Sequence, residues 1–357
     1  AGGGSIARVL PGGRVSVGPE SAGARPGPVC YGRGGVEPTV TDANLLLGRL
    51  DARFFLGGSM ALDLDGARAA MQSRIAAPLG LELAAAAAGV IRITDTKLAA
   101  AIRVSLFEKG LDPRDFAMLS FGGAGSVHAC AVAAELGIRR IVFPVDASTL
   151  SATGILGADI AHAFARSGVR VFEAAALPVI TAMAEAMRAE AAARLDTDAI
   201  PPARRRLELS IDLRYKGQAF ELTVPWGAAD IDPAALNSVR EAFHREHERR
   251  FSYANRDDIV EMVTLRLDAI GALEHPDTHA TAAATDAADA MARRRVYLDT
   301  GWHEVPVWRR DAVGDALALA GPAIIEEAYT TILIAPGWTV RRAAQGHLVA
   351  DLLEHVR

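Results

Sequence analysis

Residues 121–125, Phe-Gly-Gly-Ala-Gly, form the segment whose residue types most clearly suggest ligand binding. The apolar residues before it predict a short strand, and the residues after it predict a helix at 126–136. Glycines let a ligand approach the backbone closely, and a helix N-terminus offers unpaired N–H groups and the positive end of a dipole. Gly122, Gly123 and Gly125 are therefore candidate contacts for the phosphate or ribose of a nucleotide.

The same glycines have a second interpretation. Their spacing is not GxGxxG, and the Lys-Ser/Thr pair of a P-loop is missing. A tight turn that needs small residues only for packing would have the same sequence. The residues alone leave both interpretations open.

Three polar residues are candidates for chemistry next to this turn. Asp42 and Asn44, one residue apart in a turn-rich region, could hold a magnesium-bound water or a substrate amide. Asp42 could instead cap the N-terminus of a short helix that Gly48 ends. His128 lies in the first turn of the predicted helix, where a histidine is either structural or catalytic.

Two polar groups in the second half of the chain have simpler interpretations. The Asp-Leu-Arg-Tyr-Lys-Gly-Gln run at 212–218 is typical of a solvated hairpin tip. His244, His247 and Glu248 fall on one face of a predicted helix. Their order is not the HExxH of metalloproteases, so a solvated helix face is favoured over a metal site, and no metal ligands are predicted.

The predicted elements around the glycine turn form a strand–turn–helix–strand unit. The strands cover residues 116–121 and 139–145. A connection of this kind joins two parallel strands by a crossover helix. Further helices are predicted at about 66–77, 83–109 and 148–166. Together these elements predict an α/β domain at residues 1–168.

A second domain, predicted at residues 169–357, is mixed α+β. Its elements are expected as a helix at 177–195, strands at 207–215 and 219–224, a helix at 233–251 and a strand at 259–270. Residues 271–292 have the composition of a weakly ordered connector. Residues 295–357 predict a small β-rich module with short strands and turns.

Composition and charge exclude several classes of protein. The 357 residues, 50% of them hydrophobic, suffice for two domains with sizeable cores. A net charge of −5 gives no general attraction to nucleic acid or to an anionic membrane. Cys30 and Cys130 are too few for a disulfide framework and suit a reducing compartment, so a cytoplasmic location is expected. No apolar stretch reaches transmembrane length without interruption, and no signal peptide is expected.

Taken in order along the chain, the motifs resemble the hydantoinase A/5-oxoprolinase family, which includes related subunits of acetone- and acetophenone-type carboxylases. The stretches that carry the resemblance are AGGGSIA at 1–7, GPESAGA at 18–24, PGPVCYGRGG at 26–35, PTVTDAN at 38–44, GLDPRDF at 110–116, FGGAG at 121–125 followed by His128, DLRYKGQ at 212–218 and GPAIIEE at 321–327. The resemblance covers nearly the whole chain. Ser126 departs from it, since the family commonly has proline there.

The resemblance implies the C-terminal part of an actin-like ATPase core, followed by a smaller mixed α+β domain. It places Gly122, Gly123 and Gly125 on the adenosine side of ATP, and Asp42, Asn44 and His128 near the cleft. It also implies that the phosphate loops precede Ala1, upstream or on another chain. Weak or no binding of ATP–Mg²⁺ to the isolated chain is therefore expected.

The activity implied by the resemblance is ATP-dependent opening of a cyclic amide such as hydantoin, N-methylhydantoin or 5-oxoproline, with Mg²⁺ and phosphorylation of the carbonyl oxygen. A hydantoinase B-type partner subunit or a homo-oligomer is expected with it. Two alternatives stay open: the nucleotide-binding subunit of an acetone- or acetophenone-type carboxylase, and an inactive fragment that serves as an assembly partner. The substrate ring and the oligomeric state are not determined by the sequence.

Overall fold

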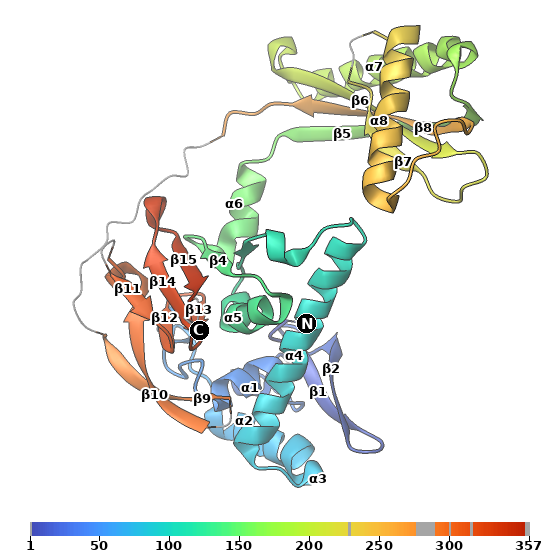
Figure 1. Cartoon of the computed structure of the whole chain (residues 1–357). Helices are drawn as coiled ribbons and strands as arrows, with labels where there is room; N and C mark the ends of the chain where they lie inside the picture. Colours follow the sequence, from blue (N-terminus) through green and yellow to red (C-terminus); the bar gives the residue numbers. More distant parts are fainter. Residues whose placement is uncertain (1, 228–229, 276–289, 300, 315–316, 354–357) are drawn as a thin grey trace. The chain divides into compact units, whose positions relative to one another are not determined.

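The computed structural model describes residues 2–227, 230–275, 290–299, 301–314 and 317–353 (Figure 1). The chain divides into two compact units. Unit 1 consists of Ala1–Thr153 and Asp277–Arg357, and unit 2 of Gly154–Pro276. This division differs from the contiguous one expected at residue 168, which lies within a strand of unit 2. The α/β fold class, with a mixed α+β part, is confirmed.

Unit 1 contains the strand–turn–helix–strand segment expected from the sequence. Strands β3 (Met118–Leu119) and β4 (Arg140–Phe143) are parallel, and α5 (Gly125–Leu136) connects them. The buried face of α5 carries small and branched residues, among them Ala129, Val132 and Ala133, which pack into the core around the sheet. The glycine turn therefore lies at the carboxyl end of β3, where ligands of parallel sheets commonly bind.

The C-terminal strands do not form the separate module expected at 295–357. Strand β15 (Leu348–Leu352) pairs antiparallel with β4, which gives a five-stranded sheet in the order β11-β14-β15-β4-β3. The other strands of this sheet are β11 (Ala318–Ala320) and β14 (Trp338–Arg342). A second sheet, in the order β13-β12-β10-β9, consists of Thr331–Ile334, Ala323–Glu326, Gly301–Arg309 and Ala292–Leu298. Long-range pairing thus joins the two ends of the chain in one unit.

Helices and a hairpin complete unit 1. The hairpin consists of β1 (Ser5–Leu10) and β2 (Arg14–Ser21). The helices are α1 (Val40–Leu46), α2 (Leu64–Met71), which continues through a π-turn at Gln72–Ala76 into α3 (Ala77–Leu79), and α4 (Leu83–Phe107). The helices expected at 66–77 and 83–109 are therefore confirmed. Their apolar faces share one core with the hairpin.

A buried carboxylate fixes the start of α1. Thr39, not Asp42, is the N-cap residue, and Asp42 occupies the third helical position of a capping box. The Asp42 carboxylate accepts hydrogen bonds from the Thr39 N–H and hydroxyl, both at 2.8 Å. It also accepts from the backbone N–H groups of Cys30 at 2.7 Å and Val29 at 3.2 Å. The expectation that Asp42 is the N-cap residue is therefore wrong, because the N-cap lies three residues earlier, at Thr39.

The helix expected at 148–166 is only partly present. Helix α6 (Leu150–Leu156) is followed by strand β5 (Ile160–Val171). Along β5 exposed and half-buried residues alternate, which is the period of a strand. Its backbone pairs antiparallel with β8 (Val260–Gly271). The alanine-rich composition favours a helix locally, and pairing with a distant strand overrides that preference.

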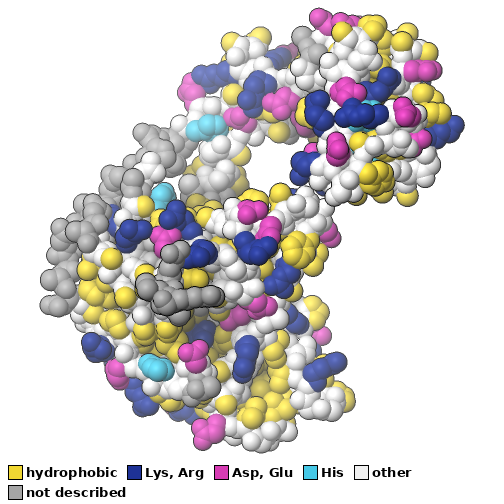
Figure 2. All heavy atoms as spheres, in the orientation of Figure 1, with side chains coloured by type: hydrophobic (Ala, Val, Ile, Leu, Met, Phe, Trp, Pro, Cys, Tyr) yellow, Lys and Arg dark blue, Asp and Glu magenta, His cyan; other side chains and the backbone are white. Residues whose placement is uncertain are grey.

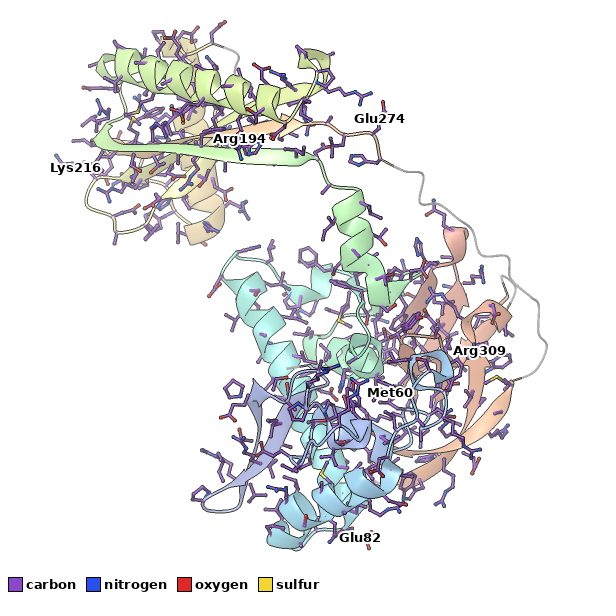
Figure 3. The ribbon with its side chains drawn as sticks, turned by 180° about the vertical axis from the view of Figure 1, so that it is seen from behind. Met60, Glu82, Arg194, Lys216, Glu274 and Arg309 are labelled. Carbon is purple, nitrogen blue, oxygen red and sulfur yellow. The ribbon has the colours of Figure 1, made fainter. Side chains whose placement is uncertain are left out.

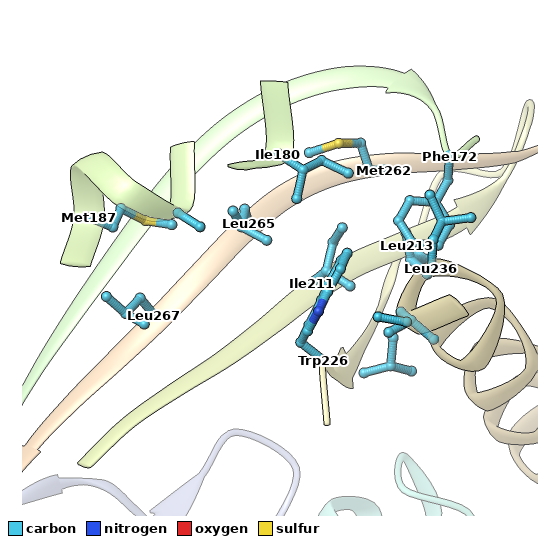
Figure 4. Packing of buried hydrophobic residues seen from close by; sticks show 14 of the residues in the cluster. Phe172, Ile180, Met187, Ile211, Leu213, Trp226, Leu236, Met262, Leu265 and Leu267 are labelled. Atoms are coloured by element: carbon cyan, nitrogen blue, oxygen red, sulfur yellow. The ribbon is translucent and has the colours of Figure 1, made fainter. Parts of the chain in front are cut away.

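Unit 2 is a four-stranded antiparallel sheet with two helices. Its order is β5-β8-β6-β7, where β6 is Arg205–Tyr215 and β7 is Leu222–Pro225. Helix α7 (Leu177–Thr197) turns a helical stripe toward the sheet, made of Ile180, Ala184, Met187, Ala191 and Leu195. Helix α8 (Pro233–Phe251) has the bounds expected from the sequence. Figure 4 shows Ile180 and Met187 of α7 facing Met262, Leu265 and Leu267 of β8.

The histidine face of α8 is buried, which corrects the expectation of a solvated face. His244 and His247 are 1% and 0% exposed and lie among aromatic rings that include Tyr215 and Phe243. The Tyr215 hydroxyl is hydrogen-bonded to Nδ1 of His244 at 2.8 Å, and the Tyr253 carbonyl accepts from Nδ1 of His247 at 2.8 Å. These histidines are satisfied core residues.

The hairpin tip expected at 212–218 is partly confirmed. Lys216 is exposed at the end of the hairpin (Figure 3). Asp212, by contrast, is fully buried within β6, and its carboxylate accepts hydrogen bonds from Arg266 and from the Thr223 hydroxyl, the latter at 2.6 Å.

The surface and the helices bear on two other expectations. On the face seen in Figure 2, acidic and basic side chains are interspersed and do not gather by sign. Within the described ranges, no single helix is long and apolar enough to cross a membrane, although the bent pair Leu64–Leu79 and Leu83–Phe107 would pass by length and composition. Most of the connector expected at 271–292 lies outside the described residues.

The burial of His244 predicts a pH dependence of stability. Burial lowers the pKa of His244, so below its ordinary value of about 6.5 the unfolded chain binds a proton that the folded chain resists. Its contribution is therefore complete above pH 6.5 and is lost as the pH falls toward the folded pKa. In His244→Gln, the carboxamide oxygen still accepts from Tyr215 but does not titrate.

We expect the wild type to lose more free energy of unfolding than His244→Gln between pH 7.5 and pH 5.5. Urea denaturation followed by circular dichroism at each pH measures this difference. Parallel pH profiles for the two proteins would show that His244 does not contribute.

The four donors on Asp42 predict a stability role. Asp42→Asn preserves the shape of the side chain but removes the charge that these donors share. We expect a loss of about 2–3 kcal/mol in the free energy of unfolding, since hydrogen bonds to charged groups contribute about 1.5–3 kcal/mol. Asp63→Asn is the matched control, because Asp63 caps α2 at an exposed position and accepts one N–H. Equal, small losses in the two variants would contradict a structural role for Asp42.

Candidate functional site

A cavity of about 310 Å³ lies in unit 1 and is lined by residues from both ends of the chain. Two glycine turns contribute to it, through Gly3, Gly4 and Gly123. Aromatic and aliphatic side chains form a second part of its wall. Three carboxylates form a third part. A cavity with apolar walls and a few converging polar groups is the usual form of a small-molecule site.

The 121–125 turn is held by contacts from two loops. Gly122 has φ +91°, a conformation that favours glycine, and its N–H donates to the Ala147 carbonyl at 2.7 Å. The Thr330 hydroxyl lies 3.3 Å from the Gly122 carbonyl and 3.2 Å from that of Gly123. Of the three glycines predicted to bind a cofactor, Gly123 lines the cavity, while Gly122 and Gly125 shape the turn and begin α5.

Gly123 needs its small size. A Cβ atom at this position would lie 3.3 Å from the Tyr329 carbonyl oxygen, which is tighter than most such contacts. The free backbone beside it belongs to the first turn of α5, which has the N–H groups and dipole that attract an anion. The position therefore fits a ligand that approaches the backbone closely.

A second glycine turn, at residues 2–5, was not predicted to be part of a site in this chain. Thr41 binds its Gly3 carbonyl twice, through its N–H and its hydroxyl, both at 2.9 Å. A Cβ atom on Gly3 would lie 2.6 Å from the Thr41 hydroxyl, and one on Gly4 would lie 2.8 Å from the Ser21 hydroxyl. Three consecutive glycines before a serine were the sequence signal that could have found it.

Asn44 and His128, predicted as candidates from distant parts of the sequence, lie together in the structure. Asn44 of α1 lines the cavity, and its Nδ2 lies 3.3 Å from Nε2 of His128 on α5. The other ring nitrogen, Nδ1, lies 2.6 Å from the Asp95 carboxylate on α4. His128 and Asp95 are buried behind Asn44. Asp95 had no predicted role, because its position against His128 depends on the packing of α4 against α5.

Asp42 does not line the cavity, although it was predicted to act with Asn44. Residues two apart on a helix point in different directions, and α1 forms over both. Asn44 faces the cavity, whereas the Asp42 carboxylate is directed at the backbone of the 29–30 segment.

Asp51, Glu326 and Glu327 supply the carboxylates of the wall. Arg294 pairs with Asp51 at 2.8 Å and with Glu326 at 2.7 Å, and Arg310 pairs with Glu327. Burial raises the pKa of Glu327, although the positive charge of Arg310 acts in the opposite direction. Sequence similarity drew attention to the 321–327 motif but gave its glutamates no chemistry.

One aromatic wall residue carries a cation on its ring. The guanidinium carbon of Arg309, labelled in Figure 3, lies 4.0 Å from the centroid of Phe54. Phe54 lines the cavity. A cation–π contact at this distance holds the ring in place.

Neither a thiolate nor a metal cluster is apparent in the described part of the chain. Both cysteines are buried, and burial raises the pKa of Cys130 to about 12, so it does not act as a nucleophile at neutral pH. The described residues contain no group of three or more His, Cys, Asp or Glu side chains that would hold a metal ion. The glycine cradles fit a nucleotide, and no ligand set for Mg²⁺ is assigned.

Comparison with known proteins matches both halves of the chain to one family. The Hydantoinase/oxoprolinase profile matches residues 1–164, and the Hydantoinase/oxoprolinase C-terminal domain profile matches residues 170–345. The alpha subunit of caprolactamase from Pseudomonas jessenii is 38% identical over 95% of this chain and 50% of its own length. A 5-oxoprolinase of Pestalotiopsis fici is 33% identical over 94% of this chain and 27% of its own length.

Solved structures of related enzymes are also similar to this chain. The crystal structure of the ATP-dependent caprolactamase from Pseudomonas jessenii superposes with a TM-score of 0.82 at 35% identity, over 99% of this chain and 52% of that chain. The nucleotide-free acetone carboxylase superposes with a TM-score of 0.77 at 25% identity, over the same shares. The chain spans about half the length of the curated relatives it matches first. With both halves matched in order, the chain belongs to the hydantoinase/oxoprolinase family.

Proposed function

We propose that this chain supplies the adenosine-binding part of an enzyme that opens a cyclic amide at the expense of ATP. The observation that supports this most directly is the cavity that Gly123 lines together with Gly3 and Gly4. Cyclic-amide hydrolysis is named in the caprolactamase and 5-oxoprolinase relatives.

The two glycine turns suit different parts of a nucleotide. The 121–125 turn, with the apolar wall beside it, suits the adenosine. The turn at 2–5 has backbone groups that a phosphate can approach, which extends the site beyond the half expected from the sequence. Residues on another part of the enzyme would complete it.

The proposed reaction begins with attack of the amide carbonyl oxygen on the γ-phosphorus of ATP, which releases ADP. Water then adds to the activated carbon, the ring C–N bond breaks as the nitrogen takes a proton, and a second water releases phosphate from the acyl group. Positioned donors and Mg²⁺ would stabilise the charge that develops on the transferred group. A partner subunit of the hydantoinase B type and self-association are proposed with this activity, and the named subunits of related enzymes support an assembly.

A carboxylase subunit is the second candidate, favoured by the likeness to acetone carboxylase. Assays of the enzyme, purified with its partner subunits, distinguish the two candidate functions. With caprolactam, 5-oxoproline or N-methylhydantoin, the first proposal requires ADP release together with ring opening. Bicarbonate-dependent ADP release with acetone, and none with any cyclic amide, would establish the second candidate instead.

The nucleotide contact has a direct test in this chain. An added methyl group in Gly123→Ala crowds the Tyr329 carbonyl oxygen, so the turn or the Tyr329 backbone beside the cavity must shift. We expect affinity for ATP–Mg²⁺ to fall about tenfold, equivalent to about 1.4 kcal/mol. Titration followed by amide NMR detects the weak binding expected of the isolated chain.

Gly89→Ala is the matched control for this titration. Gly89 lies in α4, where an added Cβ meets no atom within 4 Å, so the variant should bind as the wild type does. Unchanged affinity in Gly123→Ala would contradict the placement of the nucleotide at this turn.

A further inference from the structure

Asp95, His128 and Asn44 form one hydrogen-bonded series that crosses three helices and ends at the cavity. An ionised carboxylate only accepts hydrogen bonds, so the proton shared with Asp95 belongs to Nδ1 of His128, 2.6 Å away. The Asn44 Nδ2 atom only donates, so Nε2 of His128, 3.3 Å away, accepts. The partners on both sides of the ring thus agree with a neutral His128 that carries its proton on Nδ1.

The series leaves one polar atom unused. Asn44 Oδ1 is buried and has no hydrogen-bond partner among the described residues. Leaving a buried acceptor unpaired is unfavourable, because the atom loses its hydrogen bonds to water without a replacement. Asn44 is 3% exposed and lines the cavity, so a ligand in the cavity is the available source of a donor.

Neighbouring charges support this arrangement. The Arg49 guanidinium is buried and interacts electrostatically with Asp95, and burial lowers the pKa of Arg49. The Arg49 N–H also donates to the Asn44 carbonyl at 3.0 Å, which ties it to the end of α1. A positive charge thus lies near Asp95, and the backbone of the same residue is hydrogen-bonded to the backbone of Asn44.

We propose that Asp95 is a positioning residue that, through the tautomer of His128, presents the Asn44 side-chain oxygen to a hydrogen-bond donor on the ligand. This inference rests on the proposed function, because it takes the cavity as the ligand site. It gives the group that Asn44 recognises as a hydrogen-bond donor, and it excludes a carbonyl or an ionised phosphate oxygen there. His128, with both ring nitrogens occupied inside the protein, is then also a positioning residue.

Two ligands of the proposed reaction have such a donor. A cyclic amide has its ring N–H, and adenine has its 6-amino group. The chemistry is the same in both, so the experiment contains one matched pair of probes for each. The first pair is caprolactam and N-methylcaprolactam, and the second is ATP and purine riboside triphosphate, which lacks the amino group.

The first measurement needs no ligand. The ¹⁵N chemical shifts of the His128 ring distinguish the two neutral tautomers, and we expect the Nδ1–H form in the wild type. A ring in the Nε2–H form, or protonated on both nitrogens at neutral pH, would overturn the role of Asp95.

The second measurement couples the ring to the ligand. We expect the wild type to bind the probe with the donor about tenfold more tightly than its matched probe, for one of the two pairs, and Asn44→Ala to lose this preference. In Asp95→Leu, Nδ1 of His128 has lost its acceptor. We expect the Nδ1–H signal of the ring to be lost and, with it, the preference for the probe that has the donor. In Asp95→Asn, NMR shows which ring nitrogen of His128 carries the proton. If it is Nδ1, we expect the variant still to prefer the probe that has the donor. If it is Nε2, we expect the variant to prefer the matched probe that lacks the donor. If the preference for the probe with the donor stays the same in variants whose His128 ring is protonated on different nitrogens, the proposal is overturned.

Unit 2 provides a matched control. Gln218 Nε2 lies 3.2 Å from Nε2 of His247, and Gln218 Oε1 is likewise buried and unpartnered among the described residues. Gln218→Ala disrupts a pair of the same kind at a residue that does not line the cavity, and it should leave both probe preferences unchanged. A wild type that binds neither pair would overturn the proposed function and the ligand part of this inference, while the ring spectrum would still decide the part that concerns Asp95.

Discussion

The antiparallel pairing of β15 with β4 is the contact on which the cavity depends. It places the last strand of the chain beside the strand that follows α5. The 326–331 segment then lies against the glycine turn, where Thr330 binds two of its carbonyls. Arg310 strengthens the junction, since it donates to the Phe143 carbonyl at 2.7 Å and pairs with Glu327. Without this pairing the turn at 121–125 would lack one wall of the cavity.

The sequence predicted best those elements whose signals are local. Helix α8 begins at Pro233, directly after the capping Asp232, so its first residue can be predicted from local signals. It ends where Ser252 adopts a left-handed conformation. The glycine turn, α5 and the parallel pair beside them were equally legible. Strand β5 was predicted as a helix because its alanines favour one, and only the distant β8 makes it a strand. The terminal strands joined unit 1 for the same reason.

For the candidate site too, the sequence predicted what depends on local signals and missed what depends on distant contacts. Asn44 and His128 were predicted one by one, and the structure shows them in contact. Asp95, Thr330 and the two glutamates were missed, because each acquires its role from a partner far away in sequence. Asp42 was predicted with Asn44 on the basis of their spacing and of the family resemblance, and helix geometry separates them. The carboxylates of the wall also show that the acidic residues near a cavity do not by themselves give its charge. Asp51 and Glu326 both form an ion pair with Arg294, so part of their negative charge is neutralised.

The insertion of unit 2 between the two segments of unit 1 has a consequence for the order in which the protein forms. Arg140 and Asp351 are hydrogen-bonded partners 211 positions apart in the chain. During synthesis, the edge of β4 therefore stays without its neighbour until nearly the whole of this chain has left the ribosome, whereas unit 2 is continuous and can fold earlier. Exposed strand edges invite association with other chains. During synthesis, unit 1 thus exposes an unpaired strand edge for longer than the time in which unit 2 becomes complete.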